Sequence, residues 1–569
     1  MQPVSRRLLV LTLPVVIASG CFGTGSPTST TRLRTKPVAS TAVGVVATNP
    51  VAPASSVTSL KKTSSPSPKP SATTPVAAAS QAPMPSPMPS FPAIAAQAVT
   101  VNPPDGVAAG LALQAQSFLV LSAANIPEKT AVRVGAADNG GTPATAKPVL
   151  YHALSAQEPD AHAAWRRWQA TQALPAKAPR YGLQATATPL QKGASVPFYV
   201  ITSFDNDQYA DVQISARVAE VGQHCYVLID KDADKIAAEG ATLSQRAKEI
   251  AAAFDAQIYP TDTRTFGAEP NPGVDGDARL FILLSPAVGN YGKDNTLGFF
   301  AQRDEFAARA DAQPIYKHSN AKEMFYVSSR IVLKGSADDY MGTIAHEFQH
   351  MINFNQKVLV PWQKDPKNDP HSEDLWIDEG MAMYAIEANG YGLKSGGQVL
   401  ANHVKKFQQE PEQYSLTEWT GNPDDSGYGP VYLFMVYLAD RFGEDIIHTI
   451  VSSAASGTAN LDAVLRPKAT AFNRVFHDWA LANAVDPLDA ATDPAQKYAS
   501  LKMVGSNGST RLIGFASRKE LRTLPGVVTL NLRPYSLQLF DLPTGPVVPR
   551  FTLDTTAQAG SVPRLILPP

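Results

Sequence analysis

One ten-residue stretch constrains the fold of this 569-residue chain more than any other. Residues 342–351 read Gly-Thr-Ile-Ala-His-Glu-Phe-Gln-His-Met, which is the pattern H-E-x-x-H among apolar positions with helical spacing. Residues four apart lie on one face of a helix, so His346 and His350 can direct their rings at one metal ion. Glu347, beside the first histidine, can take a proton from water activated by that metal. The stretch therefore predicts a helix that carries part of a zinc site.

A zinc site with two histidines needs a third protein ligand and an open position for water. The chain has two cysteines, Cys21 and Cys225, which excludes a thiolate site. The metzincin pattern is also excluded, because Asn353 and Gln356 stand where it requires glycine and histidine. We therefore expect a carboxylate from a second helix. The candidates are Glu373, Asp374, Asp378 and Glu379.

The second helix resembles a segment of the gluzincin metallopeptidases. Residues 376–382, Trp-Ile-Asp-Glu-Gly-Met-Ala, are similar to the W-L-[ND]-E-G-[FLM]-A segment of that group, in which the glutamate is the third zinc ligand. The resemblance assigns this role to Glu379. Large apolar residues stand near it in the sequence, so a solvent-exposed position on the helix is a poor explanation for this acidic residue. His371, in the loop between the helices, could compete as a ligand, although a solvated role is expected for it.

The chain is also similar to the hyicolysin family of bacterial zinc metallopeptidases, from roughly residue 220 to 485. The segments that carry this resemblance are residues 298–300, 325–327, 346–354, 376–382 and 428–434. The resemblance implies cleavage of peptide bonds in a protein or peptide substrate, with one zinc ion per chain. It implies that Glu347 is the general base toward the metal-activated water and returns the proton to the leaving amine.

The oxyanion formed in such a reaction needs a hydrogen-bond donor. Gluzincins often use a tyrosine or a histidine that follows the third ligand. Tyr428 is the first choice here, and Tyr432 and His448 are the alternatives. Each of the three could instead pack in the core.

Around the motif, the patterns predict an α+β, zincin-like catalytic domain over residues 223–489. It is expected to combine a sheet beside the active-site helix with a helical half that follows. Strands are expected at residues 225–229, 279–284 and 323–327, and helices at 244–258, 336–355, 429–442 and 473–485.

Short strand patterns flank this domain on both sides. Residues 106–222 predict an N-terminal β domain, with a polar helix near 160–172. Residues 490–569 predict a small C-terminal β appendage for substrate or partner docking. The length and the 44% of apolar residues agree with such a multidomain architecture.

The beginning of the chain has the features of a lipoprotein. Residues 1–21 predict a signal peptide, with Arg6 and Arg7 ahead of an apolar run too short to span a bilayer. The run ends in Ala-Ser-Gly-Cys, which resembles a bacterial lipobox with Cys21 as the lipidated residue. Residues 22–105, rich in Ser, Thr, Pro and Ala, predict a disordered linker. We expect an extracytoplasmic protein held to a bacterial membrane by its lipid, at the outer membrane or cell surface.

The charge of the chain indicates which binding partners are expected. The formal net charge is −1, so no basic excess is present to attract nucleic acid. Residues 230–234, Asp-Lys-Asp-Ala-Asp, have calcium-loop spacing at their start, yet Lys235 and Ala241 stand where an EF-hand needs Gly and Glu. A calcium site is therefore weakly supported against a turn and helix-capping cluster. The oligomeric state is open.

An anchored zinc endopeptidase is the leading hypothesis. A binding or adhesion lipoprotein on a protease scaffold is one alternative, which the intact His346, Glu347 and His350 disfavour. A zinc amide hydrolase that acts on cell-wall peptides is the other.

Overall fold

The computed structural model describes residues 187–567 with gaps, three upstream strands at 97–99, 118–123 and 130–136, and the single residues Gln169 and Leu174. The gaps are residues 206–207, 236, 289–295, 309–313, 366–371, 394–396, 420–426, 486–493, 508–509, 514–526, 542–548 and 554–563. The chain divides into two units, 1–87 and 88–569, and all described residues belong to the second. The predicted signal peptide, Cys21 and His371 lie outside the described residues.

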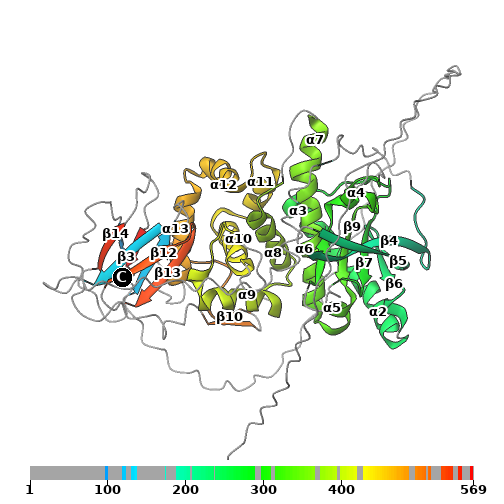
Figure 1. Cartoon of the computed structure of the whole chain (residues 1–569), viewed down its shortest axis with the longest axis horizontal. Helices are drawn as coiled ribbons and strands as arrows, with labels where there is room; N and C mark the ends of the chain where they lie inside the picture. Colours follow the sequence, from blue (N-terminus) through cyan, green and yellow to red (C-terminus); the bar gives the residue numbers. More distant parts are fainter. Residues whose placement is uncertain are drawn as a thin grey trace, which may run out of the picture. The chain divides into compact units, whose positions relative to one another are not determined.

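A six-stranded mixed sheet underlies the motif (Figure 1). Its order is β4 (Ser195–Asp205), β5 (Gln208–Val221), β6 (Cys225–Asp230), β7 (Leu280–Ser285), β9 (Met324–Ser328) and β8 (Gly298–Phe300). β6, β7 and β9 run parallel, and the remaining pairs are antiparallel. The parallel strands are buried along their whole length, as continuous apolar runs covered on both faces should be. The three strands expected in this domain are thus confirmed.

The predicted active-site helix is α6 (Ala337–Phe354). Its start is a capping box, in which Ser336 Oγ accepts from Asp339 N at 3.2 Å and the Asp339 carboxylate accepts from Ser336 N at 3.0 Å. Every residue from Tyr340 to Phe354 is buried. A helix enclosed on all sides holds its side chains in fixed positions, as a site for a metal requires.

Further helices cover the sheet and form the helical half. Those near the sheet are α2 (Ala237–Ala253), α3 (Tyr259–Phe266), α4 (Pro314–Lys317), α5 (Ser329–Lys334) and α7 (Val360–Lys364). The helical half consists of α8 (Leu375–Ala388), α9 (Gln398–Gln409), α10 (Tyr428–Phe442), α11 (Asp445–Ser452), α12 (Gly457–Leu465) and α13 (Phe472–Val485). Among the described residues, these helices are all too short or too polar to cross a bilayer.

The second motif helix, α8, lies between α6 and α10. A Cβ built on Gly380 would lie 3.0 Å from Met435 Cε and 3.3 Å from Val431 O. A larger residue would push α10 away, so Gly380 permits the close approach of the two helices. The residue beside Glu379 therefore helps to set the depth of α8 in the core.

Strands from opposite ends of the chain share two further sheets, drawn in cyan and red in Figure 1. Their orders are β1 (Gln97–Val99), β15 (Arg564–Leu567), β2 (Phe118–Ala123), β13 (Ser536–Asp541), and β12 (Val527–Leu532), β3 (Thr130–Ala136), β14 (Pro549–Leu553). A separate ribbon joins β10 (Val504–Asn507) to β11 (Thr510–Ile513). We call the two shared sheets the terminal β unit.

This pairing differs from the expected separate N- and C-terminal β regions. β2 and β3 pair only with strands from beyond residue 526 among the described strands, and β1 lies within the expected linker. β4 and β5, expected in the N-terminal domain, belong to the central sheet instead. The alternating pattern of a strand shows which residues are extended. It does not show which strand pairs with it, because that strand can lie hundreds of residues away in the sequence.

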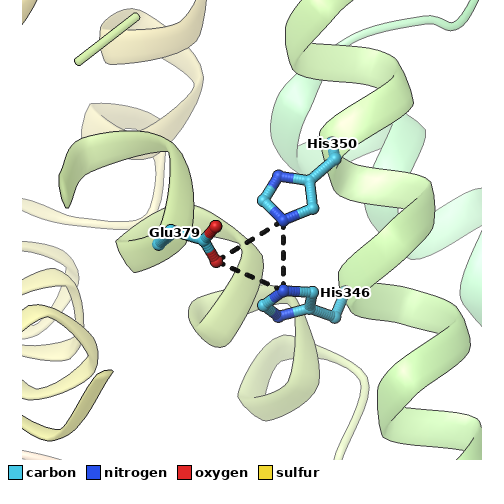
Figure 2. A group of neighbouring side chains, drawn as sticks. All are labelled: His346, His350 and Glu379. Atoms are coloured by element: carbon cyan, nitrogen blue, oxygen red, sulfur yellow. Dashed lines mark hydrogen bonds and ion pairs between the residues drawn. The ribbon is translucent and has the colours of Figure 1, made fainter. Parts of the chain in front are cut away.

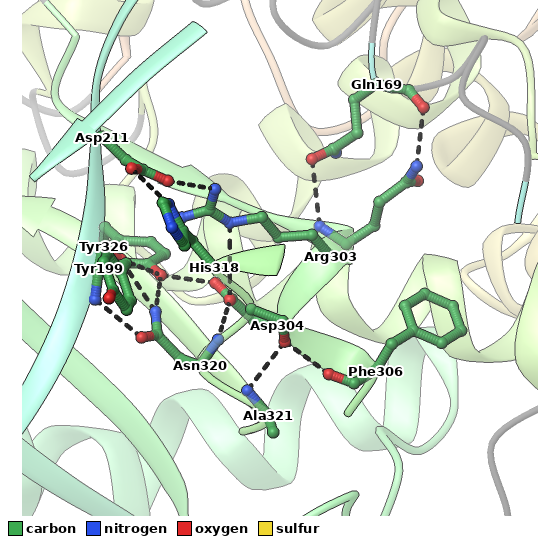
Figure 3. A network of polar contacts seen from close by, with 12 residues as sticks. Gln169, Tyr199, Asp211, Arg303, Asp304, Phe306, His318, Asn320, Ala321 and Tyr326 are labelled. Atoms are coloured by element: carbon green, nitrogen blue, oxygen red, sulfur yellow. Dashed lines mark hydrogen bonds and ion pairs between the residues drawn. The ribbon is translucent and has the colours of Figure 1, made fainter. Parts of the chain in front are cut away.

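A buried polar network fixes the chain just after β8 (Figure 3). Arg303 in η3 (Gln302–Glu305) is fully buried, with Nη1 2.9 Å from Asp211 Oδ2 and Nε 3.7 Å from Asp304 Oδ1. Asp304 in turn accepts hydrogen bonds from Asn320 N at 2.7 Å and from Tyr326 OH at 2.5 Å. Buried charges need such partners. The network ties the end of β8 to β5 and β9.

Candidate metal centre

One turn of α6 brings the two motif histidines together (Figure 2). The Nε2 atoms of His346 and His350 lie 3.1 Å apart, and the two rings are perpendicular with centroids 4.7 Å apart. Both side chains are buried. The local geometry of the helix is therefore sufficient to point two imidazole nitrogens at one position.

Glu379 reaches the same position from α8, across from the histidines (Figure 2). Its Oε2 lies 3.4 Å from His346 Nε2 and 3.6 Å from His350 Nε2. Donors held about 2.0–2.1 Å from a tetrahedral zinc are about 3.3 Å from one another. The observed separations bracket this value, so the donor set fits zinc. Within the described part of the chain, this is the group of His, Cys, Asp and Glu residues close enough to hold a metal.

Glu373, an alternative ligand from the sequence, has a structural role instead. Its Oε2 lies 2.8 Å from Lys357 Nζ and accepts from Asn460 Nδ2 at 2.6 Å, while Oε1 accepts from Gly457 N at 2.6 Å. Burial lowers the pKa of Lys357, and the Glu373 charge opposes that shift. Asp374 lies against Gly457, and a Cβ built on Gly457 would collide with the Asp374 carboxylate. These contacts join the start of α8 to the first turn of α12 and to Lys357.

Asp378, the other alternative, orients a ligand. Its Oδ1 lies 3.0 Å from His350 Nδ1 and accepts a second hydrogen bond from Asn353 Nδ2 at 2.7 Å. A proton on Nδ1 leaves the lone pair of His350 Nε2 directed at the metal position. We assign this tautomer from the carboxylate partner. The sequence placed Asp378 among the possible metal ligands, and its contact with Nδ1 of His350 gives it the orienting role instead.

Glu347 faces the edge strand of the sheet. It is buried, and a Cβ built on Gly298 of β8 would lie 3.1 Å from Glu347 Cγ. β8 is the last strand in the order of the described sheet. The predicted general base thus lies where an extended chain added to β8 would pass.

Among the predicted oxyanion donors, Tyr428 lies nearest the histidines. Its ring centroid is 6.5 Å from that of His346. The Tyr432 hydroxyl donates to Glu387 Oε2 at 2.9 Å, and His448 is exposed on α11. The structure therefore gives Tyr432 a different partner and brings Tyr428, at the start of α10, to the site.

Two aromatic neighbours of Tyr428 were not singled out by the sequence. The centroid of Tyr428 lies 5.1 Å from that of His403 on α9 and 4.9 Å from that of Trp419. Burial lowers the pKa of His403 to about 4, and the charges of Lys406 and His346 act in the same direction. Both residues belong to segments outside any motif, so no local pattern marked them.

A cavity of about 30 Å³ lies behind His350. Its polar lining includes Gln169, Gln302, Asn353, Lys357, Glu373 and Asp378. Gln302 donates from its backbone N to Gln169 Oε1 at 3.2 Å and from Nε2 to Gln169 O at 2.7 Å. A residue expected in the N-terminal domain therefore lines the back of the site.

The acidic cluster considered for calcium is held by turn and ion-pair contacts. Asp230 accepts from Ser285 Oγ at 2.6 Å and from Asp232 N at 2.9 Å, and Arg217 Nε lies 2.5 Å from Asp234 Oδ2. Burial raises the pKa of Asp230, and its hydrogen bond from Ser285 opposes the shift. This arrangement favours the turn and capping interpretation.

Proteins that the comparisons match to this chain include metallopeptidases. Over 235 residues the chain is 29% identical to the neutral metalloprotease ShpI of Staphylococcus hyicus, an alignment that covers 38% of this chain and 48% of the relative. The chain thus spans about half the length of the curated relative it matches. The structure of an M1 zinc metallopeptidase from Deinococcus radiodurans aligns with 68% of this chain and 89% of that one, at 12% identity and a TM-score of 0.27. No family model matches the chain.

Proposed function

We propose that this protein is a zinc metallopeptidase that hydrolyses peptide bonds outside the cytoplasm. The observation that carries the proposal is the triangle of His346 Nε2, His350 Nε2 and Glu379 Oε2, with sides of 3.1, 3.4 and 3.6 Å. Its dimensions and its donor types suit a three-ligand catalytic zinc site. The sequence similarity to a metalloprotease supports the same activity.

A zinc ion held by these groups would polarise the scissile carbonyl and lower the pKa of water. Glu347 takes the water proton and delivers it to the leaving amine. Tyr428 donates to the carbonyl oxygen as negative charge develops there. Asp378 keeps His350 in the tautomer that leaves Nε2 available as a ligand.

The substrate is an extended peptide that binds along β8. An edge strand offers backbone donors and acceptors to a second chain, and this recognition does not require a chain end. Gly298 keeps the strand close to Glu347, because a Cβ at this position would meet that side chain. We therefore propose endopeptidase action on unfolded or flexible segments.

For the location, we propose export and lipid anchoring through Cys21, with the Ser-, Thr-, Pro- and Ala-rich residues between Cys21 and β1 as a tether. An apolar run after two arginines and a cysteine after small residues support this proposal. Labelling with a radioactive fatty acid would test it, because Cys21→Ser should abolish incorporation and release the protein from the membrane fraction.

The activity is tested by comparing the wild type with Glu347→Gln. We expect about one zinc per chain in both proteins and a roughly thousandfold loss of casein hydrolysis in the variant. Glu444→Gln, the same chemical change at an exposed position, is the control and should keep full activity. Retained activity in Glu347→Gln would refute the proposal. If the protein binds zinc but hydrolyses only cell-wall peptides, the amide hydrolase is favoured. If it binds zinc and hydrolyses no substrate, the binding lipoprotein is favoured.

A further inference from the structure

A strained tyrosine marks the place where the terminal β unit meets the helical half. Tyr535 lies between β12 and β13, is buried with 7% of the residue exposed, and has a φ of 49°. A bulky residue in the left-handed region is a strained outlier. Such strain persists only where the surroundings determine the conformation, so the contacts of Tyr535 must hold it there.

The Tyr535 ring is held by three residues of α13. It stacks on Phe472 with centroids 4.8 Å apart and meets the edge of Phe476 at 5.3 Å. Its hydroxyl donates to Asn473 Oδ1 at 2.8 Å. These contacts offset the backbone strain and attach the terminal β unit to the catalytic region.

The first path from Tyr535 leads to the helix of Glu379. Phe472, on which Tyr535 stacks, also stacks on Trp376 with centroids 5.6 Å apart and an interplanar angle of 29°. Trp376 is buried in the first turn of α8, one turn before Glu379. The rings of Tyr535, Phe472 and Trp376 therefore form a continuous stack that supports the start of the ligand helix.

The second path leads to Tyr428 through the backbone. Tyr535 O accepts from Leu416 N at 2.8 Å, and Ser415 Oγ donates to Pro534 O at 2.7 Å. Ser415 Oγ also accepts from Glu418 N at 3.0 Å, which shapes the turn that leads into Trp419.

Trp419 completes this second path. Its ring meets that of Tyr428 edge-on, with centroids 4.9 Å apart and an interplanar angle of 83°. A Cβ on Gly427, next to Tyr428, would lie 3.3 Å from the Trp419 ring. The loop held by Tyr535 thus sets the wall against which Tyr428 packs.

We propose that Tyr535 is a positioning residue of the active site: through the two paths, the terminal β unit holds Glu379 and Tyr428 in their working positions. The inference rests on the proposed function, because it assigns a role to Tyr535 in the same site. It gives the terminal β unit a part in catalysis that a docking appendage would not have.

The test uses the full chain with Tyr535→Ala and Tyr535→Phe. We expect kcat per bound zinc to fall roughly tenfold in Tyr535→Ala with KM changed less than twofold, because misplaced groups act on the transition state. Tyr535→Phe keeps the stack and should stay within twofold of wild type. Tyr535→Leu, which keeps bulk without the aromatic stack, replaces the alanine variant if that protein does not fold.

Tyr498→Ala is the matched control for general destabilisation. Tyr498 is also buried, and its hydroxyl donates to an asparagine, Asn483 Oδ1, at 3.0 Å. It should lower the melting temperature without changing kcat per zinc. An equal loss of kcat in Tyr498→Ala and Tyr535→Ala, or no loss in Tyr535→Ala, would overturn the inference.

Two readouts separate the paths. For the Glu379 path, the visible absorption of the cobalt(II)-substituted protein should shift in Tyr535→Ala and not in Tyr535→Phe, since it reports ligand geometry. For the Tyr428 path, Tyr535→Ala should cost less in a Tyr428→Phe background than in wild type. An unchanged cobalt spectrum together with additive effects would refute both paths. Activity retained in Glu347→Gln would instead indicate failure of the proposed function, independently of Tyr535.

Discussion

The carboxylate of Asp378 lies 3.0 Å from Nδ1 of His350, on the side of the ring opposite the metal position. The neighbouring residue, Glu379, contributes its own carboxylate to the metal side. Two consecutive acidic residues of α8 therefore serve one histidine from both ends. A substitution of Asp378 should therefore alter metal binding although none of the three metal ligands is removed.

We predict that Asp378→Asn weakens zinc binding about 10- to 100-fold, because the amide can no longer accept the His350 proton as a charged partner does. Competition with a chromogenic chelator measures the affinity. Asp445→Asn, at an exposed position of α11, is the control and should bind zinc as the wild type does. An unchanged affinity in Asp378→Asn would show that His350 is oriented by other contacts.

Gly298→Ala should disturb catalysis through the edge strand. The new Cβ would lie 2.8 Å from Tyr326 O and 2.8 Å from Thr343 Cγ2, so β8 or α6 must shift. We expect kcat to fall roughly tenfold or more, because the shift changes the position of β8 relative to Glu347, while zinc content stays near one per chain, because none of the three ligands is replaced. Steady-state kinetics with metal analysis on the same samples checks this. Full activity would mean that β8 can move without moving Glu347.

Replacing Arg303 with methionine should destabilise the fold. The change leaves Asp211 and Asp304 buried without their cation, and removing one partner of a buried pair costs about 3–5 kcal/mol. Urea unfolding followed by circular dichroism measures the loss. Arg246→Met, at the exposed pair with Glu249, should change stability by less than about 1 kcal/mol. Similar losses in the two variants would contradict the assigned role of the network.

Stability should fall as the pH rises from 4.5 toward 8. Burial raises the pKa of Glu323 from 4.5 to about 8, and the pKa of the neighbouring Glu305 is also raised by burial and by the Glu323 charge. The folded chain then binds more protons than the unfolded chain in this window, so the free energy of unfolding decreases with pH and levels off above it. Each unit of pKa difference corresponds to about 1.4 kcal/mol as an upper bound.

Glu323→Gln tests this pH dependence. The amide oxygen can still accept from Val274 N, as Glu323 Oε1 does at 2.5 Å, but it does not ionise. Calorimetric melting temperatures across the window should therefore depend less on pH than in the wild type. Glu444→Gln, at an exposed position, should keep the wild-type slope. A slope that Glu323→Gln leaves intact would assign the effect to other groups.

Much of the fold could be predicted because its signals are local. The apolar runs of β6, β7 and β9 and the periodic pattern of α6 each lie within a few consecutive residues. The partners of β2 and β3 could not be predicted, since they lie about 400 residues further along the chain. The sequence also could not show that β4 and β5 belong to the central sheet. An antiparallel strand has the same residue pattern whether it joins the central sheet or a separate N-terminal domain.

The candidate site divides in the same way. The sequence by itself determined that His346 and His350 share one face of a helix, because that spacing follows from 3.6 residues per turn. It also determined that carboxylates on a second helix were the available partners. The resemblance of residues 376–382 to the gluzincin segment also pointed to Glu379 among them. Only the tertiary structure decided that Asp378 faces Nδ1 of His350, and that Tyr535 lies against Phe472 and the backbone of Leu416, on the routes to α8 and to Tyr428. Those relationships are distances between packed segments, and no local pattern encodes how two helices and a remote turn meet.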